Sequence, residues 1–306
     1  MKANISLLGS LAVAGLALVG CQKPAEKTAA TTGSTAASTT VTTSTETSSS
    51  MAGKTIRIAT EGTYKPFSIT KADGSLTGFD VDFMQALCAQ MKANCEINPQ
   101  DWDGLLPGLM AKKYDVVIDA MSITPERQAQ VDFTDPYFTN TLVFLTKQGS
   151  PINPDDPAQI DSHTVAAQRS TLSTQWMEKN HPKAKLNLYE GLDNAFMDLA
   201  AGRSDLMISD KAPAAYWLTT PEGKGFEIKG KEIDVNDKMG IIVRKGDPLR
   251  LEFNKAIATL KSNGTYDKIY NQYFGNATTT TAAASSVAVT VSSTTTTTTT
   301  VASTSK

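Results

Sequence analysis

The sequence has little net charge, few histidines and few cysteines. Its 29 Lys and Arg residues almost balance 31 Asp and Glu residues, which gives a formal net charge of −2. Without a basic field there is no electrostatic basis for binding nucleic acid. The two histidines, His163 and His181, lie in polar stretches, and no Ser-His-Asp or metal-binding set is visible. We therefore expect no metal, no cofactor and no catalytic residue.

Near its start, the chain also lacks an apolar run long enough for a typical membrane span. The run in residues 2–20 is short and is interrupted by Gly and Ser. Lys2 precedes it and small residues end it, which is typical of a secretory signal peptide. The letters LVGC, ending at Cys21, resemble the lipobox of bacterial lipoproteins. We expect residues 1–20 to be a lipoprotein signal peptide and Cys21 to carry a lipid anchor. The alternative is an ordinary signal peptide with a chance cysteine.

Only two cysteines remain once Cys21 is assigned to the lipid. Within one continuous helix, the Cα atoms of Cys88 and Cys95 would lie about 10 Å apart, at 1.5 Å per residue. A disulfide needs about 7 Å or less. The bond therefore requires the helix to end before Cys95, and Ala93-Asn94 is the expected exit. Export would supply an oxidising compartment. The alternative is two reduced, small apolar side chains.

Both ends of the chain are rich in Thr, Ser and Ala and poor in large apolar residues. Such segments cannot bury enough surface to offset their ordering entropy. We expect residues 21–53 to form a disordered, lipid-anchored tether with a reach on the order of 30 Å. Residues 276–306 are expected to form a disordered Thr-rich tail, for which we have no function.

The middle of the chain, residues 54–275, alternates short apolar strands with helices, which predicts the α/β class. Strands are expected at 55–60, 95–100, 115–121, 141–146, 163–168, 186–190, 206–209 and 239–244. Helices are expected at 80–92, 104–112, 125–129, 171–180, 193–201, 210–218, 248–262 and 266–273.

Two strands that end in polar Gly/Pro turns divide this region. They are TLVFLTKQGSP, which starts at Thr141, and MGIIVRKGDP, which starts at Met239. If both are crossovers between domains, residues 54–142 and 243–275 form lobe 1, and residues 143–242 form lobe 2.

The stretch DAMSITPERQ begins at Asp119 and crowds acid, hydroxyl and guanidinium groups into one turn. Thr124 before Pro125 is the pattern of an N-cap followed by the first helical residue. Arg127 then lies in the first turn, beside free backbone N–H groups, where it could grip a carboxylate. A cation there opposes the helix dipole, so an anion is expected nearby. Glu126 is the local alternative.

Further polar and aromatic residues follow predicted strands. Glu61 ends the first strand, and Tyr64 lies three residues later. Trp102 stands at the mouth of a predicted helix. Each has an ordinary alternative, which is a solvated acid for Glu61 and core packing for the two aromatic residues.

The second lobe offers two similar positions. Ser170 and Thr171 begin a predicted helix directly after a strand, which makes a second possible anion site. Asp210 ends another strand, where it could either cap a helix or pair with an ammonium group.

The order of these segments carries more information than any one of them. The chain resembles the periplasmic amino-acid-binding proteins of ABC importers in five segments. In chain order they are ATEGTYKPF, GFDVDFMQALC, SITPERQAQVDFTDPYF, AGRSDLMISD and NGTYDKIYNQYF. The resemblance is strongest to the arginine-, lysine/arginine/ornithine- and histidine-binding members and covers nearly all of residues 54–275. It implies two α/β lobes joined by two hinge strands that close on a ligand. It also implies a disulfide between Cys88 and Cys95.

The resemblance implies how the two ends of an amino acid would be held. Arg127, with the backbone around Ser122 and Thr171, would bind the α-carboxylate. Asp210 would pair with the α-ammonium group, helped by the Ser122 hydroxyl and the carbonyl of Ala120.

It also implies a subsite for the side chain. Tyr64 and Trp102 would sandwich it, and Glu61 takes the place of an acid that reads a cationic end. The sequence departs from the pattern at Asp119, which adds a second carboxylate near that end. It departs again at Leu172 and Arg169, and an inward-facing Arg169 would argue against a cationic ligand.

We therefore predict a non-enzymatic, lipid-anchored binding protein, periplasmic or at the cell surface and monomeric. It would capture a basic L-amino acid, with arginine ahead of lysine or ornithine and histidine last, and deliver it to an ABC permease. Two alternatives remain. One is a dehydratase of the cyclohexadienyl type on the same fold, with Glu61 or Asp119 as the acid. The other is a structural surface lipoprotein, suggested by the Thr-rich ends.

Overall fold

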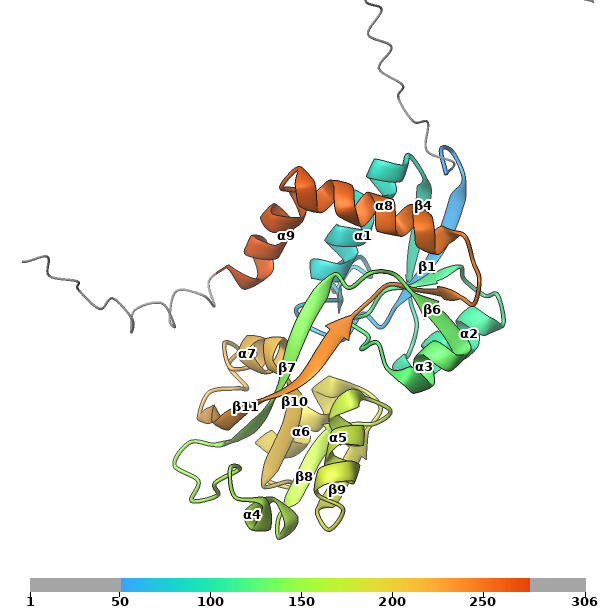
Figure 1. The fold of residues 1–306 in the computed structure, drawn as a ribbon. Helices are drawn as coiled ribbons and strands as arrows, with labels where there is room; N and C mark the ends of the chain where they lie inside the picture. Colours follow the sequence, from blue (N-terminus) through green and yellow to red (C-terminus); the bar gives the residue numbers. More distant parts are fainter. Residues whose placement is uncertain (1–50, 276–306) are drawn as a thin grey trace, which may run out of the picture. The chain divides into compact units, whose positions relative to one another are not determined.

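The computed structural model describes residues 51–275 (Figure 1). The predicted signal peptide, the lipidation site Cys21 and the predicted tail 276–306 lie outside the described residues, as does most of the predicted tether. Placing Met51–Gly53 in that tether was wrong: Met51 is buried in the core, and the N–H of Gly53 donates to the carbonyl of Lys92 at 2.9 Å. Within residues 51–275, no helix has the length and apolar character needed to cross a bilayer.

The first of two five-stranded sheets has the strand order β4-β1-β5-β12-β6. Its strands are β1 (Thr55–Thr60), β4 (Asn94–Pro99), β5 (Val116–Val117), β6 (Val131–Phe133) and β12 (Ile242–Arg244). β1 runs parallel to β4 and β5, whereas β12 is antiparallel to β5 and β6. The helices that belong with it are α1 (Phe79–Met91), η1 (Trp102–Gly104), α2 (Leu105–Met110), α3 (Pro125–Gln130), α8 (Leu249–Ser262) and α9 (Thr265–Phe274). A short hairpin, β2 (Ile69–Thr70) and β3 (Leu76–Thr77), completes this part, which we call lobe 1.

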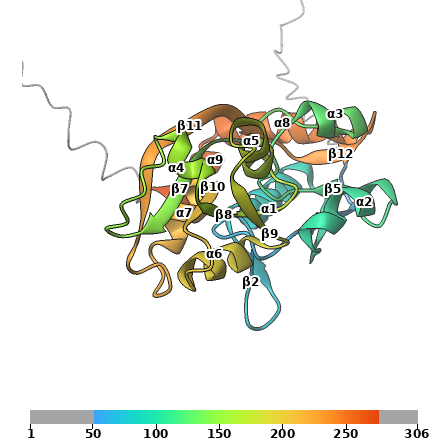
Figure 2. The ribbon, with the colours of Figure 1, turned by 90° about the horizontal axis from the view of Figure 1, so that it is seen from below.

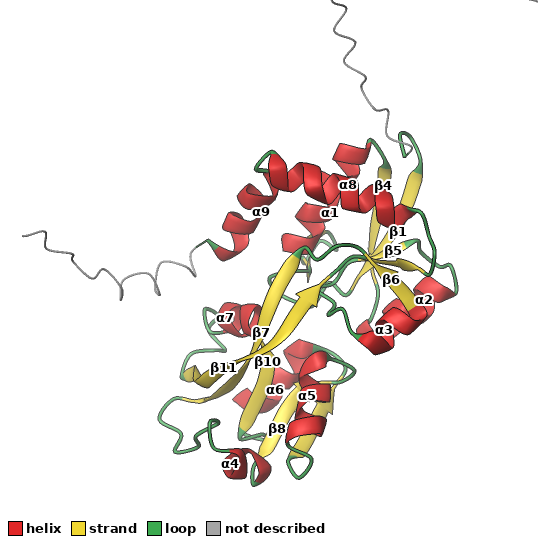
Figure 3. Cartoon of the chain, in the orientation of Figure 1, coloured by secondary structure: helices red, strands yellow, loops and turns green. Residues whose placement is uncertain are grey.

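The second sheet has the order β11-β7-β10-β8-β9 and forms lobe 2 with its helices (Figure 3). Its strands are β7 (Phe138–Lys147), β8 (Thr164–Gln168), β9 (Lys185–Tyr189), β10 (Leu206–Asp210) and β11 (Phe226–Met239). Its helices are α4 (Pro157–Asp161), α5 (Leu172–Asn180), α6 (Leu192–Ala200) and α7 (Lys211–Trp217). Helices α5 and α6 pack against β8 and β10, one on either side (Figure 2). The α/β class with two sheets is therefore confirmed.

The chain passes between the sheets twice, and the two passages lie side by side. The first, residues 134–137, joins β6 to β7, and the second, Gly240 and Ile241, joins β11 to β12. The N–H of Thr134 donates to the carbonyl of Ile241 at 2.9 Å, and the N–H of Ile241 donates to the Thr134 hydroxyl at 3.0 Å. Which residues move together as lobes, with limits expected near 142 and 242, stays a prediction.

Strands β2, β3, β6 and β11 and helix α4 were not predicted. β11 pairs with β7 along its length, but charged residues and Gly230, with φ of +80°, interrupt its alternation. Its pairing shifts register twice. A strand whose period of two is broken in this way gives only a weak signal in sequence.

The cysteine pair is joined as the resemblance implied. The Cα atoms of Cys88 and Cys95 lie 6.2 Å apart, because α1 ends at Met91 and the chain turns back into β4. The turn is made by Lys92 in the left-handed conformation, with φ of 55°. The expected exit at Ala93-Asn94 was therefore one to two residues late, since Asn94 already pairs in β4.

We expect the double variant Cys88→Ser/Cys95→Ser to lose about 2 kcal/mol of unfolding free energy, the loop-entropy value for a ring this small. Urea unfolding measures the loss. A reducing agent should destabilise the natural protein by the same amount and leave the double variant unchanged. Equal stability of the two proteins under oxidising conditions would contradict the prediction.

Candidate functional site

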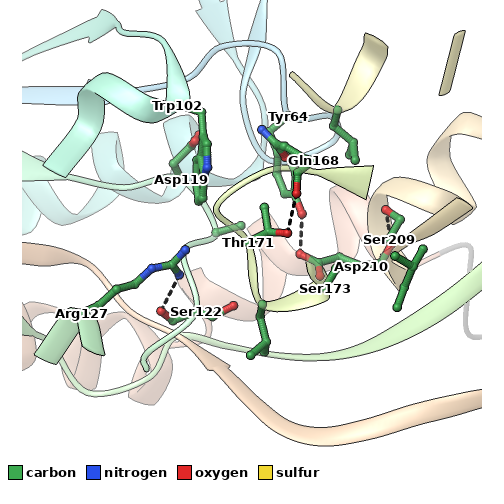
Figure 4. Close-up of a pocket in the computed structure, with 14 residues that line it drawn as sticks. Tyr64, Trp102, Asp119, Ser122, Arg127, Gln168, Thr171, Ser173, Ser209 and Asp210 are labelled. Atoms are coloured by element: carbon green, nitrogen blue, oxygen red, sulfur yellow. Dashed lines mark hydrogen bonds between the residues drawn. The ribbon is translucent and has the colours of Figure 1, made fainter. Parts of the chain in front are cut away.

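A pocket lies between the lobes, at the ends of strands from both sheets (Figure 4). Its lining consists of Tyr64, Trp102, Asp119, Ala120, Ser122, Arg127, Gln168, Thr171, Leu172, Ser173, Leu192, Ile208, Ser209 and Asp210. Eight of the ten residues predicted for ligand binding are thus brought together. Glu61 and Ser170 do not line the pocket but contact residues that do.

Arg127 is held at the pocket by the turn that the sequence predicted. Thr124 caps α3, and its hydroxyl accepts a hydrogen bond from the N–H of Arg127 at 3.3 Å. The guanidinium donates to the carbonyl of Ser122 at 2.8 Å and, across the lobes, to that of Ser170 at 2.9 Å. It also lies 5.5 Å from the centre of the Trp102 ring. Burial lowers the pKa of Arg127 to about 10, so the group stays charged at neutral pH.

Within the described residues the guanidinium forms no ion pair with Glu126, but the two charges still attract each other, so the local alternative for Arg127 stays open. The Trp102 ring lies against the guanidinium of Arg127, so Trp102 helps to orient that cation. The sandwich with Tyr64 stays a prediction.

Asp210 ends β10 and stands at the N-cap position of α7, yet its side chain makes no capping bond. Its Oδ2 instead accepts a hydrogen bond from the Tyr64 hydroxyl of lobe 1. Burial, and next the charge of Asp237, raise the pKa of Asp210 to about 7. Asp237 was not predicted. It is buried in β11, where Asn140 of β7 donates to it at 3.0 Å.

Asp119 follows β5, and its two carboxylate oxygens have different surroundings. Oδ1 accepts hydrogen bonds from the Thr60 hydroxyl at 2.8 Å, the Ser68 hydroxyl at 2.9 Å and the N–H of Glu61 at 3.0 Å. Oδ2 is buried and has no hydrogen-bond partner within residues 51–275. Because Asp119 lines the pocket, this oxygen is available to a donor on a bound molecule.

Glu61 lies outside the pocket lining and contacts Gln168 of β8, which does line it. Gln168 was not predicted from the sequence. The Glu61 carboxylate accepts hydrogen bonds from the Thr63 hydroxyl at 2.7 Å and from Nε2 of Gln168 at 3.3 Å. Burial, and next the charge of Asp119, raise the pKa of Glu61 to about 8. Burial also raises the pKa of Asp119, to about 6.

Ala120 adopts a left-handed conformation, with φ of 45°, that non-glycine residues seldom occupy. Its N–H donates to Oδ2 of Asp80 at 2.6 Å and to the Tyr137 hydroxyl at 3.1 Å. Asp80 is fully buried in the first turn of α1, and burial raises its pKa to about 8. These bonds fix the backbone at Ala120. Asp80 was missed because acids are common in the first turn of helices.

Residues 56–276 match the model of the bacterial extracellular solute-binding proteins, family 3. The chain belongs to this family. The L-arginine-binding protein of Pseudomonas aeruginosa is 36% identical over 231 residues, which cover 73% of this chain and 89% of that protein.

Solved structures agree with this assignment. An ancestral arginine-binding protein bound to arginine is 36% identical, with a TM-score of 0.69, and the match covers 74% of this chain and all of that one. A second structure, an ancestral arginine-binding protein bound to glutamine, is also 36% identical, with a TM-score of 0.68, over 72% of this chain and 98% of that one. The family is one of solute-binding proteins and these relatives are amino-acid-binding proteins, which favours a binding role over the dehydratase alternative.

In this solute-binding protein, Arg169 lies at the rim and not in the pocket. Its guanidinium contacts Asp103 of lobe 1, with Nε 2.6 Å from Oδ2, and Glu190 of lobe 2 at 3.4 Å. Its carbonyl accepts a hydrogen bond from Nε1 of Trp102 at 3.1 Å. Arg169 thus joins the lobes outside the site and adds no positive charge to the pocket lining.

The buried acids predict how stability depends on pH in the absence of added amino acid. Asp80, Glu61, Asp119 and Asp210 have raised pKa values, so the folded protein keeps protons that the unfolded chain releases above about pH 4. The free energy of unfolding should therefore fall as the pH rises from about 4 to 8.

Urea unfolding at several pH values measures this slope. Asp80→Asn removes one of the buried groups and should flatten it, whereas Asp73→Asn, at an exposed acid, should not. Stability that rises over this range would contradict the assignment of the buried acids.

Proposed function

We propose that this protein captures a basic L-amino acid, with arginine preferred over lysine or ornithine and histidine last, and delivers it to an ABC permease. The observation that carries the proposal is a pocket that holds Arg127, Asp210 and the unpartnered Oδ2 of Asp119 together. This charge pattern complements a molecule with one anionic and two cationic ends. The relatives named as arginine-binding proteins support the same ligand class.

Two groups would receive the α-carboxylate. Arg127 stays charged and can offer a forked pair of N–H donors. On the facing lobe, α5 begins after Thr171, and its N-terminus favours an anion. The hydroxyl of Thr171 is engaged with the carbonyl of Gln168 and the N–H of Thr174, which leaves the backbone of the first turn to the ligand.

The α-ammonium group would bind Asp210, with the Ser122 hydroxyl and the carbonyl of Ala120 as further acceptors. Asp210 is buried, and the Tyr64 hydroxyl donates a hydrogen bond to its carboxylate. An ammonium group supplies the charge that this hydroxyl lacks.

The side chain would extend toward Asp119 and Glu61. A guanidinium or ammonium end can donate to Oδ2 of Asp119, where a neutral apolar end would leave a buried acceptor unsatisfied. We further propose that the protein works outside the cytoplasm as a monomer, anchored through a lipid on Cys21, and that closure of the lobes on the ligand creates the form that the permease recognises.

Thermal unfolding against the twenty amino acids and ornithine tests this function. Arginine at 100 times its Kd should add about 2.7 kcal/mol to the unfolding free energy. Arg127→Ala should weaken every ligand by a similar factor, because all share the α-carboxylate. Glu61→Gln should weaken cationic ligands selectively. The proposal fails if no basic amino acid stabilises the protein, or if Glu61→Gln affects neutral ligands alone.

Arg169→Ala should speed ligand dissociation several-fold, because its ion pair with Asp103 is made only when the lobes meet. The pair is partly exposed, so it has only the modest strength of a surface ion pair. Stopped-flow fluorescence measures the rate. Arg57→Ala is the matched control, since Arg57 pairs with Asp115 at 2.9 Å inside lobe 1 with similar exposure. Equal dissociation rates in the two variants would show that the rim contact does not hold the lobes closed.

A further inference from the structure

Glu61 and Asp119 are two buried acids at the lobe interface, and the charge of each acts on the same site. Glu61 is 8% exposed and Asp119 is 1% exposed. The backbone N–H of Glu61 donates to Oδ1 of Asp119, so the two residues are locked together. Within the described residues, no Lys or Arg forms an ion pair with either of them. Two buried acids without a cation cannot both be ionised at low cost.

The groups that face Glu61 do not lower the cost of ionising both acids. From its own loop the Thr63 hydroxyl donates, and from β8 the Gln168 amide donates. From α6 the charge of Asp193 adds repulsion. The nearby Lys65 ammonium is 2.8 Å from Asp193, with which it forms a rim ion pair.

Asp119 is surrounded in the same way. The hydroxyls of Thr60 in β1 and Ser68 in the following loop donate to Oδ1. The carboxyl of Asp80 in α1 and the Tyr64 hydroxyl also lie within electrostatic reach. Within residues 51–275, the groups found to donate to the pair or to act on its charge are therefore neutral or acidic.

We propose that the Glu61–Asp119 pair carries one proton until a guanidinium or ammonium side chain enters, and that entry releases this proton to solvent. The inference rests on the proposed function and deepens it. With the proton in place, the pair carries one negative charge less, which suits a neutral amide or urea side chain. Without it, the pair is a stronger partner for a cation.

The raised pKa of Glu61, caused first by burial and then by Asp119, places the bound proton on the pair near neutral pH. A cation brought against the pair lowers that pKa. Ligand choice should then depend on pH, with cationic side chains favoured as the pH rises toward about 8 and neutral ones relatively favoured below it.

Isothermal titration calorimetry with arginine and with citrulline tests the proposal. Citrulline has the shape of arginine but carries a neutral urea group, and both share the α-ammonium and α-carboxylate groups. Proton release from Asp210, or from any other group that senses the shared end, therefore cancels between them. Titrations near pH 7 in two buffers of different ionisation enthalpy give the number of protons released. Arginine should release about one proton more than citrulline.

The same experiment on Glu61→Gln should remove most of this extra release, whereas Glu96→Gln, at an exposed acid of β4, should leave it unchanged. Below the pKa of the pair, the affinity ratio of arginine to citrulline should rise about tenfold per pH unit in the natural protein. Should citrulline fail to bind, the natural protein and Glu61→Gln are compared with arginine alone. Arginine binding without extra proton release overturns this inference and leaves the proposed function standing. Failure of every basic amino acid to bind overturns both.

Discussion

The burial of charge between the lobes is the constraint on which the rest of the site depends. Arg127 and Asp210 are each 8% exposed, and neither forms an ion pair within the described residues. A charge buried without a charged partner costs several kcal/mol. The protein meets that cost in part with neutral groups, which are two backbone carbonyls for Arg127 and the Tyr64 hydroxyl for Asp210. These hydrogen bonds give each charged group a partner but no opposite charge. The site therefore favours a molecule that supplies opposite charges.

The same bonds also join the lobes. Arg127 of lobe 1 donates to the carbonyl of Ser170 in lobe 2, and Tyr64 of lobe 1 donates to Asp210 of lobe 2. Lobe closure and charge compensation therefore use the same side chains. Under the proposed function, a ligand that completes the charges would also stabilise the contact between the lobes and so favour the closed arrangement.

Sequence reasoning succeeded where one local pattern decides the outcome. Thr124 before Pro125 fixed the start of α3, and charged residues at strand ends converged on one pocket, because the ends of neighbouring strands meet at a sheet edge. It failed where the partner is distant in sequence. Asp80 and Asp237 have ordinary local surroundings, and only the fold brings them to Ala120 and Asp210. Strand β11 was missed because its pairing with β7, not its own pattern, defines it.

The count of acids near the pocket also shows why protonation must enter any account of specificity. Among the described residues, five buried acids, Glu61, Asp80, Asp119, Asp210 and Asp237, lie at or next to the pocket, which holds one buried guanidinium, that of Arg127. A basic amino acid carries one net positive charge, so it cannot balance all of these acids even when bound. The remaining excess has to be held as protons, since a surplus of buried negative charge is costly. The selectivity of this pocket therefore depends on which acid gives up its proton for which ligand, and not on the number of acids alone.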